Sequence, residues 1–210
     1  KENLPAILEA WYPGEQGGNA IAGVLFGDVN PSGKLTVSIP RSAGHIPVFY
    51  NRKPTHRGYY RVRGTQEQPG RDYVFSSPDP LFPFGFGLSY TSYEYSELRL
   101  GKTSYSVEDK AIQITLIVTN TGNRAGRETV QLYFNDLISS VATPVMSLKG
   151  FEKVELRGGE RREVSFELPV QELGLWNRSM EYVVEPGEFE IMIGASSEDI
   201  RLRKTITLLR

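Results

Sequence analysis

The acidic side chains best suited by type to proton transfer lie in the first part of the chain. They are Glu9, Glu15, Asp28, Asp72 and Asp79. Two carboxylates can share the roles of general acid and general base when the fold brings them together. No spacing singles out two of the five, and a carboxylate just ahead of a helix, as at Glu15, is stabilised by the helix dipole. We therefore expect solvated, turn-forming or helix-starting roles, and we assign no catalytic residue to this chain.

Neither a metal centre nor a nucleophilic triad is expected. The chain has no cysteine, and its two histidines, His45 and His56, fall in expected loops without an acid at ligand spacing. No nucleophile-elbow sequence surrounds a serine. Gly14, Gly17 and Gly18 open a helix as a phosphate loop would, but the Walker lysine and the downstream acid of a dinucleotide site are missing. The sequence thus predicts no cofactor and no metal, and these glycines are expected to let a strand and a helix pack closely.

Arginines and tyrosines alternate in the segment from Tyr50 to Arg63. Side chains of this kind can stack on sugar rings and bond their hydroxyl groups, or can bind single-stranded nucleic acid. The formal charge of -1 disfavours nucleic acid as a partner. Packing against the sandwich or a preceding domain is the expected role of this segment, and a position of Arg57, Tyr59 or Tyr60 near a sugar substrate is the alternative.

Three further aromatic residues invite a binding interpretation. Trp11 and Tyr12 end an apolar run and are expected in or near the core, although ligands also favour the carboxyl ends of strands in open α/β sheets. Trp176 lies in an expected sandwich loop, where a packed aromatic is the default and polysaccharide binding the alternative.

Composition limits the class of protein. With 210 residues and 39% hydrophobic content, the chain can bury a sizeable core in one large domain or two modest ones. Lys and Arg number 24 against 25 Asp and Glu, so neither nucleic acid nor an anionic membrane is favoured. No apolar run approaches the roughly 20 residues of a membrane span, and the first residues do not resemble a signal peptide. We expect a soluble protein.

The first third of the chain has an α/β pattern. Residues 6–11 read as a buried strand, and the paired glycines after them start a helix that Gly27 should end. Asn30-Pro31-Ser32-Gly33 reads as a tight turn. Residues 35–39 alternate like a strand and stop at Pro40. Between residues 41 and 83 the periodicity disappears, but the many aromatics there favour ordered packing.

Beyond Tyr90 the pattern changes to short, alternating, half-buried strands. About seven of them, separated by turns near residues 120–123, 157–160 and 185–187, indicate an antiparallel sandwich of the immunoglobulin or fibronectin type III kind. The aromatic, glycine-rich stretch 82–91 should form a packed seam between the two parts rather than a flexible linker. We therefore predict an α/β portion with its connection over residues 1–90, and a β-sandwich over residues 91–210.

Three motifs together resemble glycoside hydrolase family 3, in particular its β-glucosidase and β-xylosidase branch with a C-terminal fibronectin type III-like domain. They are WYPGEQGGNAIA at residues 11–22, LFGDVNPSGKL at 25–35 and LFPFGFGLSYT at 81–91. The resemblance covers essentially the whole chain. The family commonly carries a glutamate directly before the paired glycines, where this chain has Gln16.

The resemblance implies retaining hydrolysis of terminal β-linked glucose or xylose by two carboxylates, which must lie about 5 to 5.5 Å apart. In the family, the nucleophilic aspartate lies on an N-terminal barrel and the acid/base glutamate on the α/β domain that follows. The glutamate would precede Trp11, so neither residue is transferred to this chain, which is expected to be inactive alone. Its expected partners are that barrel, the remainder of the α/β domain and a β-linked oligosaccharide.

Two other interpretations stay open at this point. The chain could be a noncatalytic carbohydrate-binding or interaction module, because sandwiches carry many functions. It could also be one piece of a processed enzyme that remains bound to its barrel. By analogy with the family, the compartment is expected to be the periplasm or the cell exterior.

Overall fold

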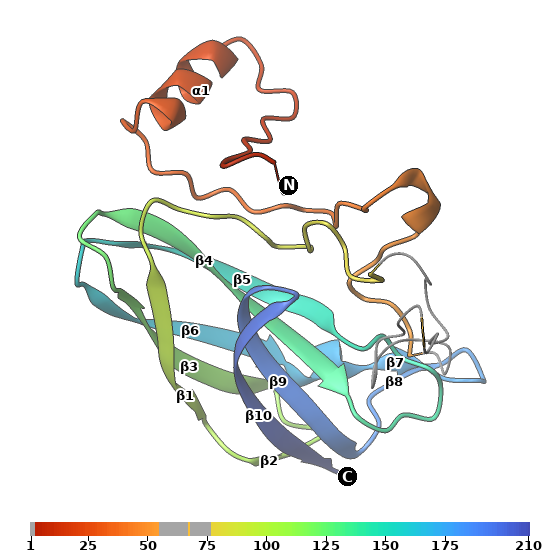
Figure 1. Cartoon of the computed structure of the whole chain (residues 1–210). Coiled ribbons are helices and arrows are strands. Elements are labelled where there is room, and N and C mark those ends of the chain that lie inside the picture. Colours follow the sequence, from red (N-terminus) through yellow and green to blue (C-terminus); the bar gives the residue numbers. More distant parts are fainter. Residues whose placement is uncertain (1–2, 55–66, 68–76) are drawn as a thin grey trace.

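A computed structural model describes residues 3–54, 67 and 77–210 of the chain. A twisted β-sandwich occupies the C-terminal part, and a mostly irregular N-terminal segment, residues 3–54 and 77–90, lies across one face of it (Figure 1). Within the described residues, no helix has the length and apolar character needed to cross a membrane.

Two sheets form the sandwich. The smaller sheet has the order β1-β3-β6 and the larger one the order β2-β10-β9-β4-β5. All pairings in these sheets are antiparallel except that of β2 with β10, which is parallel and departs from the predicted purely antiparallel arrangement. The strands are β1 (Tyr93–Leu100), β2 (Ser104–Ser106), β3 (Ala111–Asn120), β4 (Gly126–Asp136), β5 (Ser147–Leu156), β6 (Arg161–Pro169), β9 (Gly187–Ser196) and β10 (Asp199–Leu209).

The remaining sandwich elements are short. The turn-like helix η2 (Val170–Leu173) leads into a hairpin of β7 (Leu175–Trp176) and β8 (Tyr182–Val183) at one end of the sandwich. The three predicted turn regions all lie between strands. The first strand begins at Tyr93, and the boundary between residues 90 and 91 stays a prediction.

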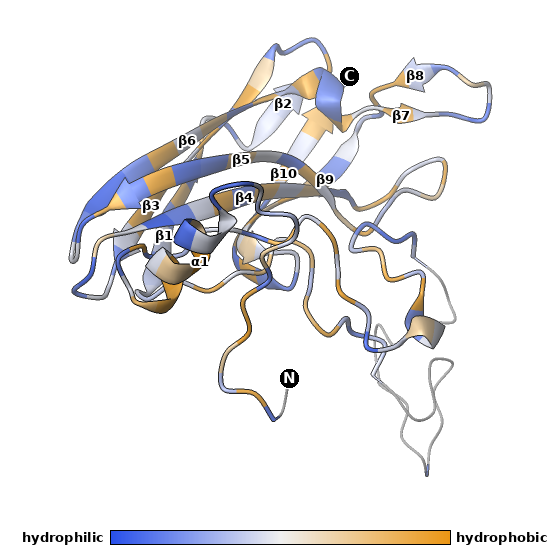
Figure 2. Cartoon of the chain, turned by 90° about the horizontal axis from the view of Figure 1, so that it is seen from above, coloured by the Kyte–Doolittle hydropathy of each residue, from blue (hydrophilic) through white to orange (hydrophobic). Residues whose placement is uncertain are grey.

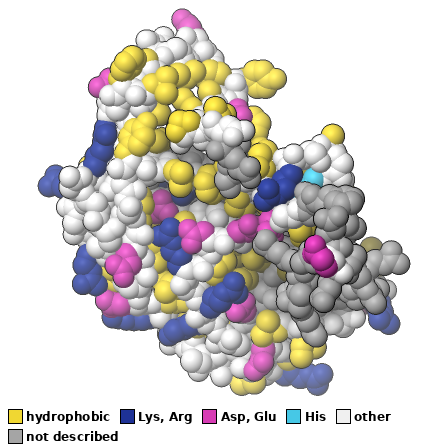
Figure 3. Space-filling view, viewed as in Figure 1, with side chains coloured by type: hydrophobic (Ala, Val, Ile, Leu, Met, Phe, Trp, Pro, Cys, Tyr) yellow, Lys and Arg dark blue, Asp and Glu magenta, His cyan; other side chains and the backbone are white. Residues whose placement is uncertain are grey.

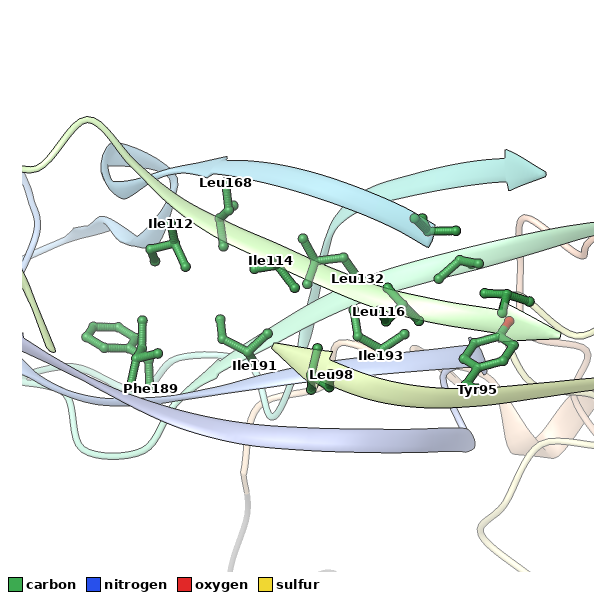
Figure 4. Close-up of a cluster of buried hydrophobic side chains, with 14 of the residues drawn as sticks. Tyr95, Leu98, Ile112, Ile114, Leu116, Leu132, Leu168, Phe189, Ile191 and Ile193 are labelled. Carbon is green, nitrogen blue, oxygen red and sulfur yellow. The ribbon is translucent and has the colours of Figure 1, made fainter. Parts of the chain in front are cut away.

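The hydrophobic core lies between the two sheets, where their side chains point toward one another (Figure 4). The predicted alternation along β3 is confirmed, because Ile112, Ile114, Leu116 and Val118 are all buried. Across the core they face β4 and β9, whose buried inner residues include Leu132, Phe189, Ile191 and Ile193. Burial of so many large apolar side chains is the main source of the sandwich's stability.

Two strands of the larger sheet are buried on both faces, which corrects the prediction of half-buried strands throughout. On the outer face of β4, Gln131 is only 3% exposed and Tyr133 is fully buried, and Met192 of β9 lies beside them. The N-terminal segment covers this face. Polar residues at alternate positions therefore mark a covered face here rather than a solvated one.

Of the elements predicted in the α/β portion, the helix is the one that forms fully within the described residues. Helix α1 spans Gly17–Leu25, and Gly27, at φ 84°, follows its C-cap as predicted. The strand predicted over residues 6–11 is wrong for this structure: Ile7 and Leu8 are exposed and no described strand pairs with them. An extended segment without a partner strand leaves its backbone groups to water, so the apolar pattern alone does not create a strand.

The second predicted strand, residues 35–39, pairs only loosely. Leu35 and Ile39 exchange backbone hydrogen bonds with residues 81–86, yet a single bridge, Ile39 with Phe82, is formed. The predicted tight turn at residues 30–33 is also absent, because this stretch is irregular and the turn after α1 lies at residues 26–27. The short helix η1 (Ala43–His45) is the other regular element of the N-terminal segment.

The N-terminal segment carries many hydrophobic residues along its course (Figure 2). A number of their large side chains are exposed. In the space-filling view they gather over the upper part of the molecule, where that segment lies (Figure 3). They include Leu4, Ile7, Leu8, Trp11, Tyr12, Leu25, Phe26, Val29, Val37, Ile46, Phe49 and Leu88. An exposed apolar surface of this extent marks a site of contact with other protein or with a ligand.

Candidate functional site

The described structure does not bring the sequence-predicted candidates together. Arg57, Tyr59 and Tyr60 lie outside the described residues, as do His56 and Asp72. Their predicted roles therefore stay predictions.

The four described carboxylates among the candidates have local roles or open exposure. Glu9 accepts the backbone N–H of Trp11 at 3.0 Å, and Asp79 accepts the hydroxyl of Ser77 at 2.9 Å. Glu15 and Asp28 are exposed. The solvated or turn-forming roles expected for these carboxylates stay predictions.

His45 is buried and fully used by the backbone. Its Nδ1 accepts the backbone N–H of Arg41 at 3.2 Å, and its Nε2 lies 3.0 Å from the carbonyl oxygen of Pro78. Both nitrogens are occupied, and a metal ligand needs one of them free. Among the described residues, no group of three His, Cys, Asp or Glu side chains is placed to hold a metal ion.

The aromatic candidates are exposed where burial was expected. Trp11 is 57% exposed and Tyr12 is fully exposed, because no other described element packs on them, so the predicted core position is wrong here. Trp176 is 61% exposed and packs against the ring of Tyr182, with centroids 5.5 Å apart, rather than in the core.

A polar seam forms where the N-terminal segment meets the outer face of the larger sheet. At its centre the amide Nε2 of Gln131 donates to the carbonyl oxygens of Gly85, at 3.1 Å, and Ala195, at 2.7 Å. The amide oxygen accepts the hydroxyl of Tyr133 at 2.6 Å. Burial raises the pKa of Tyr133, which therefore acts as a neutral donor. All three contacts are buried, and satisfied networks of this kind fix one arrangement of the surrounding chain.

Aromatic packing completes the centre of the seam. The ring of Tyr50 stacks on Phe84 with centroids 4.2 Å apart, and it meets the edge of Tyr133 at 6.0 Å. Next to it, the backbone N–H of Ser197 donates to the carbonyl of Phe84 at 3.0 Å. Residues far apart in the sequence are thus held in direct contact, so the predicted packed seam is present.

A buried ion pair forms the second contact of the seam. Lys34 Nζ lies 3.4 Å from Glu128 Oε2 and donates to the carbonyl of Gly87 at 3.0 Å. The other oxygen of Glu128 accepts the hydroxyl of Tyr95 at 2.8 Å. Burial and the nearby Glu128 charge raise the pKa of Tyr95, which keeps its proton for this bond. Sequence reasoning missed Glu128, because an acid on an alternating strand looks solvated.

Asn30 forms the third contact and shows why the predicted turn is absent. Its Nδ2 donates to the carbonyl of Ala125 at 2.9 Å, and its Oδ1 accepts the hydroxyl of Ser89 and the backbone N–H of Tyr90. The guanidinium of Arg124 also donates to the carbonyl of Gly27. The side chain of Asn30 thus joins three segments instead of bonding its own turn.

The seam thus joins the N-terminal segment to the sandwich through hydrogen bonds, one ion pair and stacked aromatic rings. An arrangement of this kind can hold neighbouring segments of the chain in position.

Family models match both parts of the chain. The glycosyl hydrolase family 3 C-terminal domain matches residues 1–90, and the fibronectin type III-like domain matches residues 128–197. A periplasmic beta-glucosidase of Salmonella typhimurium is 45% identical over 203 residues, which are 95% of this chain and 26% of that protein. A beta-xylosidase of Formosa agariphila is also 45% identical, over 99% of this chain and 27% of that protein.

Solved structures agree with these sequence relatives. A β-glucosidase from Erythrobacter marinus superposes with a TM-score of 0.88 at 47% identity, covering 99% of this chain and 26% of that one. The β-glucosidase of Listeria innocua in complex with glucose gives a TM-score of 0.87 at 34% identity, covering 95% and 27%. The chain therefore spans about a quarter of the length of the relatives it matches.

Proposed function

Because the chain belongs to glycoside hydrolase family 3, whose C-terminal domain and fibronectin type III-like domain it carries, we propose that it serves a retaining β-glycosidase. The enzyme would remove terminal β-linked glucose or xylose from oligosaccharides. The observation that carries this proposal is the match of nearly the whole chain to about a quarter of a β-glucosidase and of a β-xylosidase.

The chain's own contribution in this proposal is support. The seam fixes the N-terminal segment on the sandwich, and the exposed apolar side chains of that segment are then available to pack against the remainder of the α/β domain. Burying this surface would stabilise the assembly by about 25 cal/mol per Å² of apolar area. The N-terminal barrel of the same enzyme is the other proposed partner.

Catalysis would depend on residues outside this chain. A retaining mechanism needs a nucleophile and an acid/base carboxylate about 5 to 5.5 Å apart across the glycosidic bond. The described carboxylates among our candidates are exposed or bonded locally, and Glu128 is bound in the seam. We therefore propose that this polypeptide alone hydrolyses no β-glycoside.

Two finer proposals rest on sequence and relatives. Arg57, Tyr59 and Tyr60 are retained as residues near the substrate, on the arginine and tyrosine pattern alone. A location in the periplasm or outside the cell is supported by the Salmonella relative, which is named as periplasmic. Cell fractionation tests the location, and kcat/KM of the longer enzyme with Arg57→Ala tests the substrate role.

The main test compares two proteins on aryl β-glucoside and aryl β-xyloside substrates. We expect turnover from the longer protein that carries this chain with a family 3 barrel, and none from the rigorously purified 210-residue chain. Turnover by the short chain would overturn the supporting role. Absence of turnover by the longer protein on both substrates would overturn the glycosidase assignment.

A further inference from the structure

A pair of exposed aromatic rings lies at one end of the sandwich, on the hairpin of β7 and β8. Trp176 is 61% exposed and Tyr182 is 46% exposed. They face each other across the hairpin, with ring centroids 5.5 Å apart and planes inclined by 63°. We call these two rings the aromatic pair. No contact of the seam involves them, and they are separate in sequence from the exposed apolar residues of the N-terminal segment.

The aromatic pair is held in a fixed geometry. The hydroxyl of Tyr182 donates to the carbonyl of Gln171 at 2.9 Å. Its ring lies so close to Gly174 that a Cβ there would meet ring carbons at 2.6 Å. Tyr182 is thus fixed from two sides, and its ring limits the orientation of the indole beside it. A rigid aromatic surface loses little conformational entropy when it binds a ligand.

The turn of the hairpin is equally ordered. Oδ1 of Asn177 accepts the backbone N–H groups of Ser179, at 2.9 Å, and Glu181, at 3.0 Å. Its Nδ2 donates to the carboxylate of Glu181 at 3.2 Å. Arg178 is exposed and makes no hydrogen bond or ion pair within the described part of the chain, so its guanidinium donors are available to a ligand.

From this geometry we propose that the hairpin is a carbohydrate-binding site that stacks Trp176 on a pyranose ring of a β-linked oligosaccharide. The apolar C–H face of such a sugar matches one exposed indole in size, while its hydroxyl groups can bond polar side chains of the adjoining turn, Asn177, Arg178 and Glu181. A stable protein interface buries about 800 Å² per partner, far more than one short hairpin with a charged turn presents. The choice of sugar as ligand rests on the proposed function.

Tryptophan fluorescence offers a direct test, because the chain has only two tryptophans. Trp11→Phe leaves Trp176 as the sole indole, and titration of that variant of the full chain with cellohexaose and with xylohexaose should change its emission. Trp176→Ala should weaken binding, measured by calorimetry, at least tenfold, whereas Trp176→Phe should retain most of it. Trp11→Ala is the matched control, since Trp11 is 57% exposed on the other part of the chain, and should bind as the unchanged chain does.

Three results would overturn the proposal. The first is that the unchanged chain binds neither hexasaccharide, and the second is that Trp176→Ala and Trp11→Ala bind equally well. The third is that Trp176→Ala no longer associates with the rest of the enzyme. The last result would make the hairpin a protein contact. Thermal melting of each variant excludes unfolding as the cause.

Failure of this proposal and failure of the proposed function are distinguishable. If the unchanged longer enzyme turns over a small aryl β-glycoside but oligosaccharide binding does not depend on Trp176, only the proposed binding site is refuted. If binding depends on Trp176 but the longer enzyme shows no turnover, only the glycosidase assignment is refuted.

Discussion

Gly85 lies at the centre of the seam, and its replacement by alanine tests whether the Gln131 contacts hold the N-terminal segment on the sandwich. Its φ is 78°, in the left-handed region, and a Cβ there would meet Oε1 of Gln131 at 2.1 Å. Gly159, between β5 and β6, has nearly the same φ of 75°, but its Cβ would meet nothing within 4 Å. The two substitutions therefore share the free-energy cost of a left-handed alanine and differ in whether the new Cβ collides with Gln131.

The magnitude follows from the bonds that Gln131 would lose. The shared cost of a left-handed alanine is about 1 kcal/mol and cancels between the two variants. Displacing Gln131 breaks its bonds to the carbonyls of Gly85 and Ala195 and removes the acceptor of the Tyr133 hydroxyl. Each bond contributes about 1 kcal/mol net, and a buried unpaired donor costs about 1–3 kcal/mol. We expect Gly85→Ala to lower the free energy of unfolding by about 3–5 kcal/mol more than Gly159→Ala does.

Urea unfolding of the full chain, followed by circular dichroism, measures this difference. Limited proteolysis should also cut the N-terminal segment faster in Gly85→Ala than in Gly159→Ala, because local release of the segment precedes cleavage. Equal unfolding free energies for the two variants, within about 1 kcal/mol, would refute the role given to the Gln131 contacts.

Three further predictions use matched pairs of residues. Lys34→Met leaves the Glu128 charge buried without its cation and should cost about 3–5 kcal/mol in urea unfolding, while Lys153→Met, at the exposed edge of the same seam, should cost less than about 0.5 kcal/mol. Burial raises the pKa of Asp136, so the protonated carboxyl stabilises the fold at low pH and this contribution is lost as the pH rises. Asp136→Asn should therefore melt at a higher temperature than the unchanged chain at pH 7. This gain should fade as the pH falls toward about 4. In contrast, the backbone N–H of Ser106 and the Lys102 ammonium lower the pKa of Asp109. Asp109→Asn should therefore lower the melting temperature at pH 7, and this loss should fade on acidification. A change of melting temperature with the same sign in both Asp variants would contradict these assignments. In the core, Leu116→Ala should cost about 2–5 kcal/mol, and the exposed Leu209→Ala should leave the melting temperature nearly unchanged.

The sandwich could be predicted because its strands carry their own signal. The alternation of Ile112, Ile114 and Leu116 with polar residues predicts a strand with one buried face, and the turn residues between strands limit the length of each strand. The outer face of β4 could not be predicted in the same way. Gln131 and Tyr133 look like surface residues until residues 82–86, which precede them by more than forty positions, are placed on top of them.

The N-terminal segment departs from its sequence pattern for the opposite reason. Its apolar run at Ile7 and Leu8 predicts a buried strand, but a strand needs a neighbouring strand, and the described structure offers none there. The candidate site shows the same limit. Lys34 and Glu128 are separately unremarkable charges, and only the tertiary fold makes them a pair.

The covered outer face of β4 and β9 also constrains how this protein can be divided and recombined. A sandwich cut free at residue 91 would keep its inner core, but Tyr133 would lose its contact with the ring of Tyr50 and Gln131 would lose the carbonyl of Gly85. Transfer of the sandwich to another enzyme therefore requires the 81–90 strip to travel with it. The segment that must be exchanged is thus longer than the sandwich strands alone. Chimeras of related enzymes should fold only when residues 81–90 and the sandwich come from the same parent enzyme.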